Sequence, residues 1–224
     1  QPTVASAGNL TSAVYRIFGK PFSEEGKKLF GVPFAQFLKL NSEFRYHYRI
    51  DKNQMIASRI AGGVIWSYGN ATTAPYTEQF YIGGANSVRA FSARSIGPGG
   101  YPPETDRKYT YINHVGDIRI EANIEYRFRM IADLHGAVFL DAGNVWLMRK
   151  DENRPNGEFT LKNFPKQIAL GTGFGLRYDL DFLVFRLDLG IGLHDPYDTG
   201  KSGYYNIPKF KDSMALHFAI GYPF

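Results

Sequence analysis

The sequence predicts an all-β protein, an antiparallel transmembrane β-barrel meander of about eight strands. Residues 117–130 give the clearest observation, because apolar and polar side chains alternate there without interruption, and a helix cannot produce a period of two. Most alternating runs also reach the roughly 9–11 residues that a bilayer-spanning strand needs, whereas strands of soluble proteins usually have about 5–6. The connections between these runs are alternately short turns and long loops, as in membrane barrels.

The predicted strands follow from apolar residues at every second position. They are residues 10–18, which are weakly patterned, and then 34–50, 56–68, 117–130, 134–146, 168–180, 183–193 and 214–224. A turn signal at Asp51, Lys52 and Asn53 separates the second and third strands. Residues 69–116 fit neither a strand nor a helix, and loops of that length are usually functional or disordered.

Composition narrows the class of protein. The 224 residues carry a net charge of +5, but basic and acidic residues are interleaved, so we expect no nucleic-acid partner. Cysteine is absent, which excludes disulfides and cysteine-based sites. No run of eighteen apolar residues exists, so we expect no transmembrane helix. The amino end lacks a methionine and a signal segment, from which we expect a processed, truncated or fragmentary chain.

A soluble β-sandwich binding module is the alternative architecture. It would bury the apolar face of each strand between two sheets and leave the charged face in water. A membrane barrel reverses this arrangement, with apolar residues toward lipid and polar residues toward the lumen. A sandwich would stay in the aqueous phase without detergent.

Four motifs occur in order between Phe80 and Phe224. They are Gly83-Gly-Ala-Asn-Ser-Val-Arg-Ala-Phe91, Phe139-Leu-Asp-Ala-Gly-Asn-Val-Trp146, the pair Gly173-Phe-Gly-Leu-Arg-Tyr178 and Phe185-Arg-Leu-Asp-Leu-Gly190, and Leu216-His-Phe-Ala-Ile-Gly-Tyr-Pro-Phe224. Together they resemble the outer-membrane assembly and transport barrels, the BamA/TamA and two-partner-secretion transporter superfamily with its surface-antigen relatives. Residues 93–101 further resemble the branch found in Bacteroidota.

The resemblance implies that residues 1–224 are the carboxy-terminal part of one outer-membrane barrel domain, about half of a sixteen-stranded barrel. The loop of residues 69–116 would then be inserted into the lumen. An eight-stranded barrel is just filled by its own side chains and has no room for such a loop. We therefore expect the first half of the barrel, and the periplasmic domains that precede it in the family, to come from elsewhere.

The family's loop signature maps onto Gly83, Gly84, Val88, Arg89, Ala90 and Phe91. In the family its arginine meets acidic residues of the inner wall, which implies that Arg89 pairs with Asp141, near Phe139, and with Glu125. The alternation of side chains along a strand agrees with this pairing, because Phe139 and Asp141 are two residues apart and therefore share a face. The sequence departs from the signature at Ala90, where the family usually has glycine. If that glycine has a positive φ, alanine would strain or shift the turn.

Small residues occupy one face of the strand at 168–180, namely Ala169, Gly171, Gly173 and Gly175. They leave room for the inserted loop, or they only allow the sheet to bend, as glycines in strands often do. The sequence does not decide between these two interpretations.

The resemblance implies a non-enzymatic factor that inserts or translocates proteins at the outer membrane of a Gram-negative bacterium, as a multi-pass protein. Its lateral seam would offer an unpaired strand edge to incoming strands. The strand signal beside that seam would be Leu216, Phe218, Ile220, Tyr222 and Phe224, expected as one row facing lipid. Expected partners are the bilayer with its lipopolysaccharide, nascent outer-membrane or secreted clients, the missing half with its periplasmic domains, and accessory assembly subunits. A two-partner-secretion transporter with one client and the barrel anchor of an outer-membrane lipase are the alternatives.

We expect no catalytic, metal or cofactor site. The five histidines (His47, His114, His135, His194 and His217) lie in separate segments without metal-ligand or catalytic spacing. Residues 97–100 have the glycine content of a phosphate loop but lack its lysine and its following helix.

Overall fold

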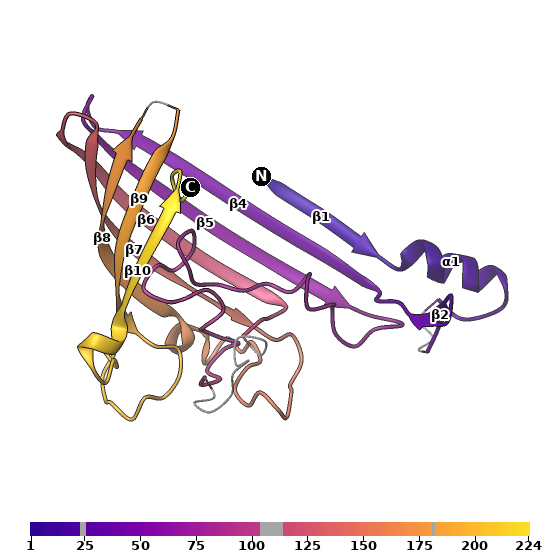
Figure 1. The fold of residues 1–224 in the computed structure, drawn as a ribbon. Helices are drawn as coiled ribbons and strands as arrows, with labels where there is room; N and C mark the ends of the chain where they lie inside the picture. The colour runs from indigo at the N-terminus through magenta and orange to yellow at the C-terminus, as the bar shows by residue number, and fades with distance from the viewer. Residues whose placement is uncertain (23–25, 104–113, 181) are drawn as a thin grey trace.

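The computed structural model describes residues 1–22, 26–103, 114–180 and 182–224. They contain one eight-stranded sheet in the order β1-β4-β5-β6-β7-β8-β9-β10 and a small sheet formed by β2 and β3. Neighbouring strands are antiparallel throughout. The predicted antiparallel meander is therefore confirmed (Figure 1).

The bounds of the elements are close to the predicted ones from residue 37 onward. In chain order they are β1 (Pro2–Ala7), α1 (Asn9–Ile17), β2 (Lys28–Leu29), β3 (Val32–Pro33), β4 (Phe37–Arg49), β5 (Gln54–Ser67), β6 (Ile118–Ile131), β7 (Leu134–Trp146), η2 (Phe164–Gln167), β8 (Ala169–Asp179), β9 (Val184–His194), η3 (Phe210–Ser213) and β10 (Met214–Ile220). None of the helices in the described ranges has both the length and the apolar character needed to cross a membrane.

Strand lengths and connections both follow the predicted pattern. β4 to β7 have 13 or 14 residues each. Short turns join β4 to β5, β6 to β7 and β8 to β9 at one end of the sheet, and the long connections all lie at the other end (Figure 1). We call the second end the loop end.

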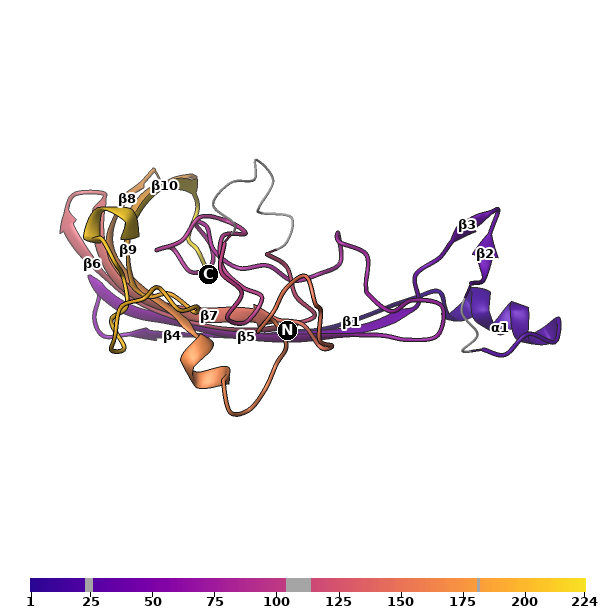
Figure 2. The same cartoon turned by 90° about the horizontal axis from the view of Figure 1, so that it is seen from below.

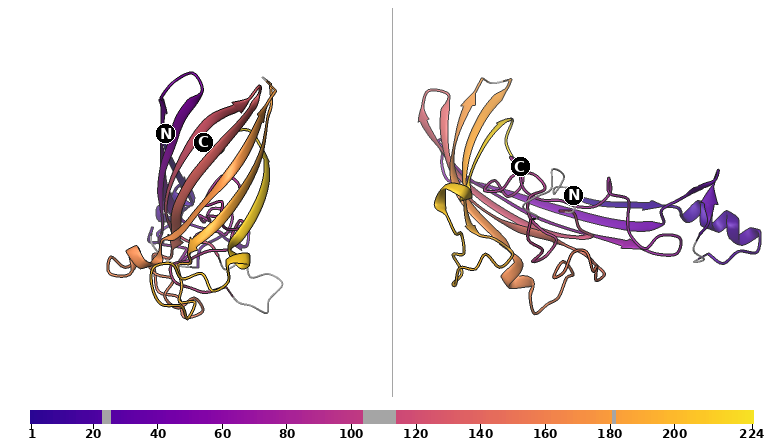
Figure 3. Two further views of the ribbon diagram at one scale, coloured as in Figure 1. Left: turned by 90° about the vertical axis from the view of Figure 1, so that its left-hand side faces the viewer. Right: turned by 60° about the horizontal axis from the view of Figure 1, so that its bottom comes forward.

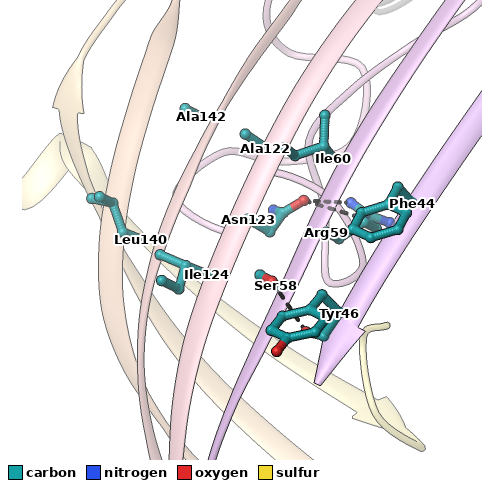
Figure 4. Close-up of a pocket in the computed structure, with 10 residues that line it drawn as sticks. All are labelled: Phe44, Tyr46, Ser58, Arg59, Ile60, Ala122, Asn123, Ile124, Leu140 and Ala142. Atoms are coloured by element: carbon teal, nitrogen blue, oxygen red, sulfur yellow. Dashed lines mark hydrogen bonds between the residues drawn. The ribbon is translucent and has the colours of Figure 1, made fainter. Parts of the chain in front are cut away.

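The two faces of the sheet differ in chemistry, as the alternation predicts. The outer face is apolar and exposed, and Figure 4 shows a shallow hollow there whose floor is formed by Ser58, Ala122 and Ala142 between larger side chains. The inner face carries buried charges, among them Glu125 and Asp141. A sandwich would bury the apolar face, so the exposed outer face is incompatible with that alternative.

The sheet is curved and open, with β1 and β10 at its two edges (Figures 1 and 3). The long loop that follows β5 lies against its concave, inner face (Figure 2). Apolar side chains of this loop and of the sheet form the buried core, namely Phe37, Ile65, Ala74, Phe80, Ile82, Val88, Ile96, Val145 and Ala169. The loop thus occupies the place that a barrel lumen would have. Part of the loop predicted at 69–116, residues 104–113, lies outside the described residues.

Two predicted strands need correction. The first strand was expected at residues 10–18, but these residues form α1, and the edge strand is instead β1 (Pro2–Ala7). The last strand was expected to reach Phe224, but β10 ends at Ile220. Gly221 then adopts a φ of +83°, a conformation that glycine reaches without strain, and the chain turns away from the strand direction.

Candidate functional site

The tip of the long loop is shaped by its two glycines. Gly83 and Gly84 have φ values of +93° and +89°, which residues with a side chain rarely adopt. A Cβ on Gly83 would lie 2.2 Å from the carbonyl oxygen of Ser92. The backbone amide of Gly84 donates a hydrogen bond to the carbonyl of Phe91 at 2.7 Å, which closes the tip.

Four residues of the predicted signature lie between this turn and the sheet. Val88 belongs to the buried core, and Phe91, which is partly buried, packs against that core. Arg89 and Ala90 are buried against the inner face. The structure therefore places the arginine at the point where the loop meets the wall.

Arg89 is held by two carboxylates at once. Its Nε and Nη2 donate to the two oxygens of Asp141 at 2.8 and 2.9 Å, and its backbone amide donates to the same carboxylate at 3.0 Å. Its Nη1 forms an ion pair with Glu125. The guanidinium carbon lies 3.5 Å from the centre of the Phe139 ring. A bidentate, stacked arginine has a fixed orientation as well as a fixed position.

Strand register explains why these wall residues meet. On β6 and β7, Asn123 is paired with Asp141, and Glu125 is paired with Phe139. Side chains of directly paired residues point to the same face of a sheet, so all four point inward. Asn123 also donates to Asp141 at 2.8 Å and to the carbonyl of Ser87 in the loop at 3.0 Å. The register of β6 and β7 alone therefore brings together the inner-face residues that bind the loop.

A buried network of charges extends beyond the residues predicted from the sequence. Arg177 on β8 pairs with Glu125 at 3.0 Å and with Asp188 on β9 at 2.6 Å. Arg127 pairs with the other oxygen of Glu125 at 2.7 Å. Arg186 donates to the carbonyl of Ala85 in the loop at 2.9 Å and lies 3.4 Å from Asp188. Alternation along β8 and β9 puts Arg177, Arg186 and Asp188 on the face opposite the large apolar side chains, but alternation alone does not connect them with the loop.

The glycine face of β8 and β9 receives the loop. A Cβ on Gly171 would lie 2.2 Å from the Cβ of Ala90, and one on Gly190 would lie 2.1 Å from the carbonyl oxygen of Arg89. On Gly173 a Cβ would reach the Phe139 ring at 2.4 Å. The contacts of Gly171 and Gly190 favour the first interpretation, room for the loop, whereas the contact of Gly173 is with Phe139 on β7. The backbone of Ala90 has no positive φ, so alanine is accommodated there without strain.

The last residues of the chain also touch the site. His217 on β10 faces the carbonyl of Arg89, with its Nε2 at 2.9 Å. Leu216, Phe218 and Ile220 point outward, as expected. The expected row does not continue, because Phe224 is buried among arginine side chains, with the guanidinium of Arg59, Arg127 and Arg89 at 5.3, 5.7 and 6.0 Å from its ring centre.

Tyr222 is displaced from the outer row as well. Its ring lies 4.5 Å from the guanidinium carbon of Arg127, a side chain of the inner face. The turn at Gly221 is the physical reason, since it ends the alternation that would have kept Tyr222 and Phe224 in line with Ile220.

The polar contacts of Arg89 bind the loop tip to β6 and β7. Among the described residues, no group of three or more histidine, cysteine or acidic side chains is arranged to hold a metal ion. His194, which stands next to Asp195, has its two ring nitrogens 2.6 Å from the carbonyl of Tyr204 and 3.0 Å from that of Lys166. His194 therefore connects the loop after β9 with η2, which precedes β8.

Comparison with curated proteins finds two relatives, which bear the same protein name. Over 204 residues the chain is 28% identical to the outer membrane protein assembly factor BamA of Nitratidesulfovibrio vulgaris, an alignment that covers 89% of this chain and 22% of the relative. Over 89 residues it is 29% identical to the protein of that name from Neisseria meningitidis serogroup B, covering 38% of this chain and 11% of the relative. The chain thus spans about a fifth of the length of the first relative.

A solved structure and a family model agree with these relatives. The crystal structure of BamA from Haemophilus ducreyi lacking POTRA domains 1–3 superposes with a TM-score of 0.56 at 16% identity, covering 83% of this chain and 35% of that chain. That similarity shows a common barrel fold. The family model of the Omp85 superfamily domain matches residues 28–224, which is most of the sequence. The chain belongs to the Omp85 superfamily.

Proposed function

We propose that this chain forms the carboxy-terminal half of an outer-membrane barrel that assembles or inserts client proteins. It would cross the membrane many times with its strands, and it would act through the free edge of β10 without a covalent reaction. Its partners would be the bilayer with its lipopolysaccharide, unfolded outer-membrane clients, the amino-terminal half of the barrel with periplasmic domains, and accessory subunits. The relatives named as outer membrane protein assembly factors support this proposal.

The observation that carries the proposal is the position of β10. It pairs with β9 on one side, and on the other it is an edge of the sheet formed by the described residues, where the amino-terminal half of the barrel would meet it at a lateral seam in this proposal. An edge strand presents unpaired N–H and C=O groups, to which an extended segment of another protein can add as a further strand. The outward side chains of β10 are apolar, so an added strand would enter at a surface suited to lipid.

The docked loop supports this mechanism by bracing the sheet beside the edge. Arg89 binds the wall formed by β6 and β7, and its carbonyl is in contact with His217 of β10. The same arginine therefore connects the interior of the sheet with its edge strand. In this proposal β10 stays near β9 while its free edge binds a client, because the loop tip holds both from the inside.

A photo-crosslinking experiment tests the proposal. A benzophenone amino acid replaces Phe218 on β10, which is 66% exposed, or Phe174 on β8, which is 42% exposed on the same face. Phe174 is the matched control, because it lies two strands away from the edge. In cells that express the full-length protein, we expect crosslinks from position 218, and not from position 174, to outer-membrane proteins during their assembly.

The proposal is contradicted if both positions crosslink such clients equally or if position 218 captures none while clients are being assembled. Crosslinks from position 218 to one secreted protein only would replace it with a dedicated transporter.

A further inference from the structure

A short amphipathic helix at the loop end of the sheet has its apolar side exposed. α1 carries Leu10, Val14 and Ile17, and Phe18 follows directly after the helix. Their spacing places them on one side of a helix. Leu10, Ile17 and Phe18 are 86%, 82% and 78% exposed. The apolar side is thus the free side of this helix.

The opposite, polar side of α1 is fixed to the protein. Ser12 donates a hydrogen bond to the side chain of Gln36 at 2.9 Å, and the ammonium of Lys27 donates to Ser12 at 3.1 Å. The hydroxyl of Tyr68 donates to the side chain of Asn9 at 2.7 Å. Ser12, Lys27 and Gln36 are buried. A helix on the surface of a soluble protein does the reverse and packs its apolar side inward.

The strand ends next to α1 also carry exposed apolar side chains on the outer face of the sheet. Val4 on β1 is paired with Leu40 on β4, and Trp66 on β5 is paired with Leu38. All four are exposed apolar side chains near the loop end, where tryptophan is typical of a membrane interface. In Figure 2, α1 continues the line of the sheet, whereas the long loop lies on the inner side.

A tight turn holds α1 next to the strand ends. Gly8 separates β1 from α1 with a φ of +74°, and a Cβ there would lie 2.3 Å from the carbonyl oxygen of Ala35. Because of this close contact the helix begins at the height where β4 begins. The first turn of α1 is therefore beside the edge of the apolar band, and the helix runs on beyond the strand ends (Figure 1).

Exposed basic residues occur in the same segment as the apolar side of α1. Arg16, Lys20 and Lys28 are exposed in this region, and residues 1–33 contain four basic residues against two acidic ones. Amphipathic helices with basic residues beside an apolar side bind at anionic lipid surfaces, with the apolar side at the level of the headgroups.

We propose that α1 lies in the membrane interface at the loop end of the barrel and binds anionic lipid headgroups. Long loops of outer-membrane barrels face the cell exterior, so the occupant of the apolar side is the phosphate-bearing outer leaflet. This attachment would fix the height of β1 and β4 in the bilayer. The inference goes beyond the proposed function, since it concerns membrane attachment and not clients.

Spin labelling tests the proposal. These 224 residues contain no cysteine, so one cysteine at a time is introduced here after any cysteine elsewhere in the full-length protein has been replaced by serine. The full-length protein is labelled at Ile17→Cys in vesicles of phosphatidylethanolamine and phosphatidylglycerol, and collisions of the label with oxygen and with a water-soluble nickel complex are measured. Leu187→Cys, on the outer face of β9, gives the lipid reference, and Lys201→Cys, in an exposed loop, gives the water reference. We expect residue 17 to collide mainly with oxygen, nearer to the lipid reference.

Two outcomes would overturn the proposal. Collision rates equal to those at residue 201 would show that the helix lies in water, and shielding from both reagents would show that another protein segment covers it. The charge component has its own test, because the double change Arg16→Glu and Lys20→Glu should shift residue 17 toward the water reference. An unchanged reading in that variant would rule out binding to anionic headgroups. Neither result depends on client assembly.

Discussion

Replacing Gly190 with alanine should push the loop tip off the inner wall. A Cβ at this position would lie 2.1 Å from the carbonyl oxygen of Arg89, 2.5 Å from its carbonyl carbon and 2.7 Å from the Cα of Ala90. All three atoms belong to the backbone of the docked loop, so no side-chain rotation relieves the contact. Either the loop or β9 must move.

The expected cost follows from this geometry. Extra methyl groups forced into a packed interior cost about 1–3 kcal/mol, and the cost falls on the docked state alone, because the undocked loop does not meet residue 190. A free energy of that size changes the population of the undocked state by about 5- to 150-fold.

The assay is thiol labelling of Val88→Cys, a core position that is fully buried when the loop is docked. In the cysteine-free chain, the labelling rate under native conditions follows the undocked population when docking is fast. We expect Gly190→Ala to increase that rate about 5- to 150-fold. The matched control is Gly192→Ala, two residues further along the strand, where the closest atom is 3.4 Å away. Equal labelling rates in the two variants would refute the reasoning.

Three further predictions concern the charges, the outer face and one loop. Arg89→Lys should destabilise the protein by about 1.5–3 kcal/mol, the range for a hydrogen bond to a charged group. The reason is that an ammonium lacks the two-pronged guanidinium geometry that binds both oxygens of Asp141. Unfolding in guanidinium chloride measures this loss, and an unchanged midpoint would contradict the prediction. Leu187→Arg on the outer face should cost about 2–4 kcal/mol near the midplane of the bilayer, and a loss of near zero would contradict that orientation. Burial raises the pKa of Asp195 in the loop after β9, so this loop should be most stable below the ordinary carboxyl pKa and lose stability as the pH rises through the raised value. Hydrogen exchange of its amides should show this dependence, and Asp195→Asn should weaken it.

Strand alternation predicted most of the sheet from the sequence alone. From β4 to β9 one face is mainly apolar, with small polar residues such as Ser58 and Thr172 among the larger side chains, and the observed bounds differ from the predicted ones by only a few residues. Parity also placed Glu125, Phe139 and Asp141 on the inner face. Their pairing with Arg89 came from the resemblance to a family, because alternation gives the face of a residue and not its partner in a distant loop.

The misassigned segments show where alternation fails. Leu10, Val14 and Phe18 fit both a period of two and one side of a helix, and the polar contacts of Ser12 that fix the helix are with residues far along the chain. At the other end, the alternation continues through Tyr222 and Phe224, yet one glycine turns the chain inward. A periodic pattern does not show where the hydrogen bonding to a neighbouring strand stops.

The sequence also could not predict which arginine of the buried network pairs with which carboxylate. Arg177, Arg186 and Asp188 share the inner face, but four arginines and three carboxylates allow many pairings. The registers of β6 to β9 together decide that Arg177 lies between Glu125 and Asp188.

The central claim, that the loop tip is bound to the wall through Arg89 and Asp141, is tested most directly by a double-mutant cycle. The free energy of unfolding is measured for the full-length protein, for Arg89→Ala, for Asp141→Ala and for the double variant. Each single change should cost about 3–5 kcal/mol, because it leaves an unpaired buried charge. The double variant should be more stable than the sum predicts, by about 0.5–3 kcal/mol.

A matched cycle of Arg89 with Asp151, whose ion-pair partner is Arg154 in another loop, should be additive within about 0.5 kcal/mol. A coupling between Arg89 and Asp141 no larger than in this control would contradict the account.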